Sequence, residues 1–354
     1  MSTPAERFLS YYETCFVIKK FKLNEYLDQE FNLKSPVKYQ VKFSSTPEIL
    51  LPSLCNTILK NLDSNPFFRL LAEKEFNESE FMSNYGTLYI TIKAAVLKIN
   101  CDENTLPKFI LLLHLSKEDL QTHIFEKCFR FLESLTIINS GIDKISEYVT
   151  ELQQLYSKLI ISKNLRKFSI ETIRKINGSM LDIDKIDISK IKLVFFNDQI
   201  LGLNGFSGAD SIYVSFNGLI NLLQNINNKL NTSSKMTIMK LNFVRLIQHE
   251  LTHILLRGLA DDMNVSTPDV LNRNNKKVAI QEPGVLSEIE RFGGRIDWIS
   301  SSLRLNIKIC DDYLNKIETD QDDKFDLIAS NVVLETSHVR CMALDMCGTT
   351  VIFE

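Results

Sequence analysis

The stretch from Met236 to Arg257 constrains the fold of this 354-residue chain more than any other. Its apolar residues recur every three or four positions, as in Phe243, Ile247, Leu251, Ile254 and Leu255. A helix with such a stripe buries one side against other elements of the fold. The stretch therefore predicts a buried helix, and Gly258 is the expected C-cap at its end.

Within this helix lies the sequence His249-Glu250-Leu251-Thr252-His253, which has the form H-E-x-x-H. Two of the five histidines of the chain occur here. Side chains four residues apart share one face of a helix, so both imidazoles can bind one metal ion. Glu250 is then placed to reach a water molecule at the open coordination position. The alternative is a pair of structural histidines held by ordinary hydrogen bonds.

A catalytic zinc ion needs a third protein ligand. A third histidine in an extended motif would require glycine at position 256 and histidine at 259, where the chain has Leu256 and Leu259. A carboxylate is therefore expected, and the candidates are Glu282 and Glu288. A helix is predicted from Pro283 to about Leu303, because proline is tolerated in the first turn. Glu282 lies at the start of this helix, and Glu288 lies in its middle.

One of the two glutamates is expected to be the ligand, with Glu282 slightly favoured, and the other is expected to accept a hydrogen bond from a ligand imidazole. Glu290 is expected on the solvated face. Glycines in a helix lower its stability, by about 1 kcal/mol each against alanine. Those at 284, 293 and 294 are therefore expected to let this helix approach the H-E-x-x-H helix closely.

The remaining pattern predicts a mostly helical α+β chain with two domains. Residues 1–177 are predicted to form a helical domain of unknown role, and residues 178–354 an α+β domain. Helices are expected over Leu51–Leu62, Phe67–Phe76, Lys117–Leu135, Ile142–Leu159 and Leu219–Leu230, and strands over Ile191–Phe196 and Ser211–Phe216. Tyr85–Ile99 suits a helix or a strand.

Composition excludes several classes of function. The chain has 41 Lys and Arg against 44 Asp and Glu, a formal net charge of −3. Nucleic-acid and membrane-surface proteins need a basic face, so neither partner is expected. Apolar runs such as Phe109–Leu113 are far too short to span a bilayer. With no secretory signal visible and seven scattered cysteines without C-x-x-C, we expect reduced thiols and a cytoplasmic protein.

The H-E-x-x-H motif, followed after a loop by a helix that carries glutamates and glycines, resembles the gluzincin branch of the zincin metallopeptidases. The resemblance covers about residues 190–300 and implies a zincin-like domain with a small sheet. In that family small residues commonly follow the third-ligand glutamate, which favours Glu282. A substrate-binding edge strand precedes the helix, and Ser211–Phe216 is in the matching place. A Tyr or His that stabilises the oxyanion is also usual, and His338 and Tyr213 are candidates.

The resemblance implies a zinc-dependent peptidase in which Glu250 is the general base and the substrate is a protein or peptide. Two alternatives remain at this point. One is a catalytically inactive interaction protein that keeps the zincin fold. The other is a zinc amidohydrolase with a non-peptide substrate.

Overall fold

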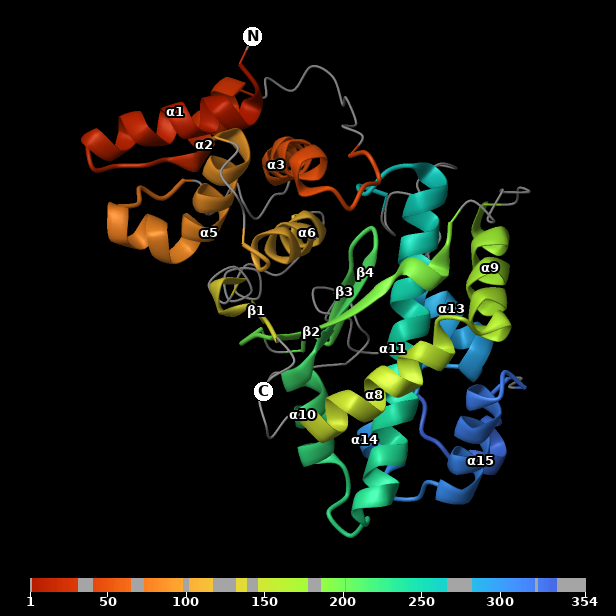
Figure 1. The fold of residues 1–354 in the computed structure, drawn as a ribbon. Coiled ribbons are helices and arrows are strands. Elements are labelled where there is room, and N and C mark those ends of the chain that lie inside the picture. Colours follow the sequence, from red (N-terminus) through yellow and green to blue (C-terminus); the bar gives the residue numbers. More distant parts are fainter. Residues whose placement is uncertain are drawn as a thin grey trace. The chain divides into compact units, whose positions relative to one another are not determined.

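The computed structural model describes residues 2–30, 41–64, 73–97, 102–116, 132–138, 146–177, 186–200, 202–265, 282–321 and 324–335 (Figure 1). This described part is mostly helical and contains a small mixed four-stranded sheet, which confirms the predicted α+β class at this level.

The chain divides into two compact units. The first comprises Met1–Ile137 with the short segments Asp198–Leu201 and Asp261–Asn264, and the second comprises the rest. Helices α8 and α9, which the predicted boundary at 177/178 assigned to the N-terminal domain, fall in the second unit because they pack on its long helix α11. The predicted boundary and the role of the N-terminal domain stay predictions.

The first unit is built from helices. They are α1 (Pro4–Val17), α2 (Leu23–Glu30), α3 (Pro47–Ser64), α5 (Glu78–Leu97) and α6 (Thr105–Leu115), followed by a 3-10 turn (Leu132–Ser134) and the two-residue strand β1 (Thr136–Ile137). Helix α1 begins at a capping box, in which Thr3 accepts from the Glu6 amide and the Glu6 carboxylate accepts from the Thr3 amide.

Several sequence predictions fall in this unit. Leu51–Leu62 lies within α3, and the ambiguous Tyr85–Ile99 belongs to helix α5 as far as Leu97. The helix predicted over Phe67–Phe76 is wrong at residues 73–76, which are not helical, and residues 67–72 lie outside the described part. Of the predicted helix Lys117–Leu135, only the 3-10 turn at its end is described.

The second unit surrounds α11 (Thr232–Ala260), the 29-residue helix that carries the H-E-x-x-H motif. Its other elements are α8 (Ser146–Leu159), α9 (Lys163–Asn177), a 3-10 turn (Ile188–Lys190), β2 (Lys192–Asn197), β3 (Gly205–Ser207), β4 (Ser211–Ser215), α10 (Phe216–Asn225), α13 (Pro283–Phe292), α14 (Trp298–Ser301), α15 (Ile307–Glu318) and α16 (Leu327–Ser330). Figure 1 shows α8, α9, α13 and α15 around α11, and each of them contacts it. The predicted burial of α11 is confirmed, since it is buried almost continuously from Thr237 to Arg257.

Two predicted helix ends are wrong. Gly258 is not a C-cap, because α11 continues to Ala260 and ends where Asp261 adopts a positive φ of 48°. Helix α13 does begin at Pro283, but it ends at Phe292 instead of Leu303. The reason is Gly293, which adopts the left-handed conformation (φ 75°) and caps the helix through its amide.

The strand order corrects the predicted edge strand. Strand β4 covers Ser211–Ser215 as expected, but it lies between β2, with which it is parallel, and β3, with which it is antiparallel. All five of its residues are buried, as expected for an inner strand. The edge strand beside β4 is the short β3, which also contacts α11.

Two further findings concern the cysteines and the apolar helices. Among the described residues, Cys15, Cys55 and Cys310 are buried free thiols. No helix in the described ranges is long and apolar enough to cross a membrane.

Candidate metal centre

Three predicted ligand residues come together between α11 and α13. His249 and His253 lie one helical turn apart on α11, and Glu282 immediately precedes α13. One ligand atom from each of the three lies within 4.8 Å of the others. The Nε2 atoms of the two histidines are 3.3 Å apart, and the His249 Nε2 lies 3.4 Å from the Glu282 Oε2. The His253 Nε2 also contacts the Glu282 Oε1.

These distances suit a small tetrahedral ion. Ligand atoms about 3.3–3.4 Å apart result when each lies ~2.0–2.1 Å from a central zinc ion. Two imidazoles and one carboxylate are also a donor set that catalytic zinc uses, with the fourth position open. The cluster therefore fits zinc in donor chemistry and in spacing.

Glu288 fixes the orientation of the first ligand. Its Oε1 lies 2.7 Å from the His249 Nδ1 and 2.9 Å from the Arg245 Nη1, and its side chain has no exposed surface. An ionised carboxylate can only accept, so the Nδ1–H of His249 donates, and Nε2 is the ring nitrogen that faces the cluster and that the neutral imidazole would offer to a metal ion. Glu288 thus lies where we predicted an outer hydrogen-bond acceptor, with Arg245 as its counter-charge.

The backbone of α13 orients the third ligand. Glu282 is the N-cap of α13, and its Oε1 accepts from the Gly284 amide at 3.0 Å while its Oε2 accepts from the Val285 amide at 2.8 Å. Pro283 occupies the first helical position, where its missing amide leaves no donor unsatisfied. The capping hydrogen bonds therefore hold the carboxylate toward the histidines before any ion is present.

Gly284 makes the close approach of the two helices possible. A β-carbon at this position would lie 2.5 Å from Cγ, Cδ2 and Cε1 of the His249 ring, which is closer than any such contact tolerates. Of the three glycines predicted to permit a close approach of the two helices, only Gly284 faces α11. Gly293 faces Leu327, and Gly294 faces Leu334.

The electrostatics of the cluster favour a cation. Burial lowers the pKa of His249, but the charge of Glu282 and the hydrogen bond to Glu288 outweigh burial and raise that pKa to about 9, with further help from Glu250. Burial raises the pKa of Glu282, yet the charges of the two histidines hold it well below its usual range. The Glu288 carboxyl is likewise buried, and the charge of Arg245 foremost keeps its pKa lowered.

Glu250 follows His249 on α11 and is 1% exposed. Its charge acts on His249 and on Arg257. A carboxylate beside the ligand set is the arrangement that general-base chemistry on a water molecule requires.

The other predicted residues have different surroundings. His338 lies outside the described residues. Tyr213 is buried on β4 and stacks on Phe206 with ring centroids 4.7 Å apart, and burial raises its pKa to about 12. Glu290 pairs with Lys175 and Lys324 near the surface, as expected of a residue on the solvated face.

The sequence analysis did not identify two arginines that also lie near the cluster. Arg245 and Arg257 lie four residues before His249 and four residues after His253, so the i, i+4 rule that places the histidines together also places both arginines near them. The four-residue spacing R-x-x-x-H-E-x-x-H-x-x-x-R is the signal that could have identified them.

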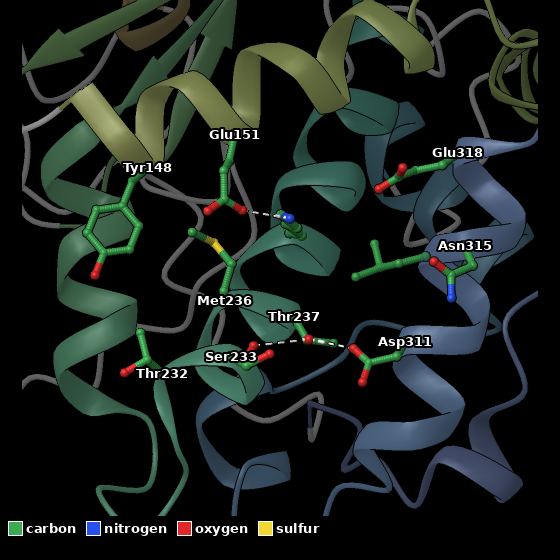
Figure 2. A pocket seen from close by; sticks show the side chains of 11 residues that line it. Tyr148, Glu151, Thr232, Ser233, Met236, Thr237, Asp311, Asn315 and Glu318 are labelled. Carbon is green, nitrogen blue, oxygen red and sulfur yellow. Dashed lines mark hydrogen bonds and ion pairs between the residues drawn. The ribbon is translucent and has the colours of Figure 1, made fainter.

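A separate cavity of about 540 Å³ lies between α8, the start of α11 and α15 (Figure 2). Its side chains are mostly polar, and some of them pair with one another, as in the ion pair of Lys240 with Glu151 at 2.7 Å and the hydrogen bond from Thr237 to Asp311 at 2.6 Å. None of the cluster residues lines this cavity.

The chain matches no family model, and comparisons with curated proteins and with solved structures gave no match. The candidate site therefore stands on its own geometry.

Proposed function

We propose that this chain is a zinc-dependent peptidase whose active site is formed by His249, His253 and Glu282, with Glu250 as the general base. The observation that carries the proposal is the convergence of two imidazole Nε2 atoms and one capped carboxylate beside a buried glutamate. Zinc bound there would lower the pKa of its water and polarise the substrate carbonyl.

The residues of the chain supply the remaining steps. Glu250 accepts a proton from water and donates it to the leaving amine. Glu288 holds His249 in one tautomer, and the α13 amides hold Glu282 in place. Under this proposal the zincin-like domain is the second unit.

The test compares zinc-loaded wild type with Glu250→Gln on casein and on a quenched-fluorescent peptide library. Glutamine has the shape of glutamate but cannot accept the proton, and general-base loss costs ~10²–10⁴-fold in rate. We expect such a fall with zinc content unchanged. Glu290→Gln is the matched control, since Glu290 pairs with Lys324 at the surface of α13 and should keep the wild-type rate. Equal rates for wild type and Glu250→Gln would support the non-catalytic alternative.

A further inference from the structure

The side of α11 next to the proposed ligands carries a second set of polar side chains, which the proposed chemistry does not use. Gln248 and Thr252 each directly precede a ligand histidine, about 100° around the helix from it. Both residues are 0% exposed. Buried polar groups are hydrogen-bonded in native proteins, so the partners of these two residues show what they hold in place.

One partner lies on α9. The Gln248 Nε2 donates to the Ser169 Oγ at 2.6 Å, and the Thr252 Oγ1 lies 3.1 Å from the same oxygen. Ser169 is fully buried as well. Helix α9 therefore contacts α11 one residue before each of the two histidines.

Another partner lies on α13. The buried Arg291 donates from Nη1 to the Gln248 Oε1 at 3.2 Å and from Nε to the Tyr313 Oη of α15 at 3.3 Å. Its guanidinium carbon also lies 5.5 Å from the centre of the Phe168 ring on α9. From α13, the side chain of Arg291 thus contacts α9, α11 and α15.

Ser287 connects the backbones of the two helices that carry the ligands. Its buried hydroxyl lies 3.3 Å from the Gln248 carbonyl oxygen and 3.1 Å from the Gly284 carbonyl oxygen. Gly284 is the residue on which the His249 ring rests. These contacts fix how far α13 lies along α11, and with it the place of Glu282 at the start of α13.

Net stability does not explain this number of buried polar side chains. Each internal hydrogen bond replaces bonds to water, and apolar groups of the same shape in place of both partners can be equally stable. Directional bonds, however, rigidify a core and specify one arrangement of its helices. A zinc site needs this precision, because zinc–ligand distances stay within about 0.2 Å of their usual values.

We propose that Gln248 and Arg291 are positioning residues that hold α11 and α13 in the register at which Glu282 and the two histidines bind one ion. Both act through the helices that carry the ligands rather than on the ion itself. This inference rests on the zinc site of the proposed function, and it does not require that the site hydrolyse peptides.

The experiment uses the whole chain and the variants Gln248→Met and Arg291→Met, since methionine is long and unbranched but cannot make these hydrogen bonds. Chelator competition should show a fall in zinc affinity of ~10–100-fold in each variant, the effect usual for groups that orient metal ligands from outside. Arg291→Lys keeps the charge and one donor for Gln248, so it should lose less.

A second readout separates positioning from stability. Cobalt(II) takes the place of zinc, and its visible absorption depends on coordination number and geometry. At saturating cobalt the absorption of both methionine variants should be weaker than that of wild type, because water replaces the misplaced Glu282 carboxylate. A residue that only stabilises the fold leaves this spectrum of the folded, fully loaded protein unchanged.

Thr237→Val is the control for loss of a hydrogen bond on α11. It removes the bond to Asp311 of α15 and should leave zinc affinity and the cobalt spectrum as in wild type. Ser287→Ala removes a single hydroxyl and serves where the methionine variants do not fold. It should lower zinc affinity at least about threefold, as expected for one lost hydrogen bond.

A cobalt spectrum like that of wild type in both folded methionine variants overturns the role of Gln248 and Arg291, as does wild-type zinc affinity in Ser287→Ala where neither of them folds. An equal loss of affinity in Thr237→Val overturns it as well. If wild type binds no zinc, the metal site fails and the positioning role fails with it. Zinc binding without Glu250-dependent hydrolysis contradicts only the peptidase proposal.

Discussion

The interior of the first unit and the α11–α13 contact of the second are built from opposite kinds of residue. In the first unit, aromatic rings pack edge to face, as in Phe8 and Tyr26 with centroids 5.4 Å apart and Phe8 and Phe21 at 6.0 Å. In the second, His249 and Glu288 are fully buried between the two helices. Apolar burial stabilises a fold in proportion to area, whereas buried charges contribute little net stability. The contrast is what the proposed metal site would require, since binding a metal ion needs polar groups at this contact.

The largest effect expected from this contrast is on metal content. His249→Ala/His253→Ala should remove zinc completely, because two of three ligands are lost. His114→Ala, which truncates a buried histidine of the first unit, should retain about one zinc per chain. Elemental analysis of the purified proteins measures both. Zinc retained in the double variant would show that His249 and His253 are not the metal ligands.

Substitutions of Glu282 and Glu288 should lower the zinc affinity by different amounts. Glu282→Ala should abolish tight zinc binding, whereas Glu288→Ala, which removes only the partner of His249, should weaken it by ~10–100-fold. Chelator competition measures both affinities. Since Glu282→Ala also removes an N-cap, Glu282→Asn is the better variant, because asparagine caps a helix but is too short to take the place of the ligand. The reverse order of the two affinities would exchange the roles of Glu282 and Glu288.

Two glycine substitutions sharpen the comparison between the units. Gly284→Ala should destabilise the fold by about 1–3 kcal/mol and weaken zinc binding, because the His249 ring has to move. A β-carbon at Gly86 on α5 would meet the end of the flexible Met82 side chain at 3.3 Å and the Glu133 Oε1 at 3.4 Å, and no backbone atom is among its nearest neighbours. Gly86→Ala should therefore change the unfolding free energy by less than ~1 kcal/mol, toward stability. Urea unfolding of both variants tests this. A neutral Gly284→Ala would mean that α13 is not held as closely as described.

The smallest expected effect is a pH dependence of the metal-free protein. Because the fold raises the pKa of His249 from 6.5 to about 9, its protonated form stabilises the fold fully below pH 6.5, and this contribution is lost as pH rises through 9. Urea midpoints between pH 6 and 10 should therefore decline more steeply for wild type than for His249→Gln. Identical slopes would show that the surrounding carboxylates do not hold a proton on His249.

Local patterns predicted much of the site. The four-residue spacing of His249 and His253 and the proline after Glu282 are signals within one element, and the structure brings these three residues together. The long α11 and the start of α13 were predicted for the same reason. Gly293 was available as a stop signal, but the apolar periodicity beyond it suggested a longer helix.

The rest depends on contacts between distant parts of the chain. Strand β4 has an inner position because it pairs with both β2 and β3. The residue pattern of a single strand does not show which strands it pairs with. The bond from Arg257 to Ser207 joins residues 50 positions apart, and Arg245 finds its partner in Glu288 43 positions away. Periodicity locates such residues on a face but does not say what the face meets.

The capping role of Glu282 has a consequence for how the protein would take up the proposed zinc ion. Each carboxylate oxygen of Glu282 already accepts a hydrogen bond from a backbone amide, so the cap of α13 and the solvation of this charge do not depend on a metal ion. Classical zinc fingers, by contrast, are unfolded without metal. We expect this chain to exist as a folded apoprotein whose occupancy rises and falls with the free zinc concentration around it. Under the proposed function, the free zinc concentration would then control the fraction of folded chains that are active.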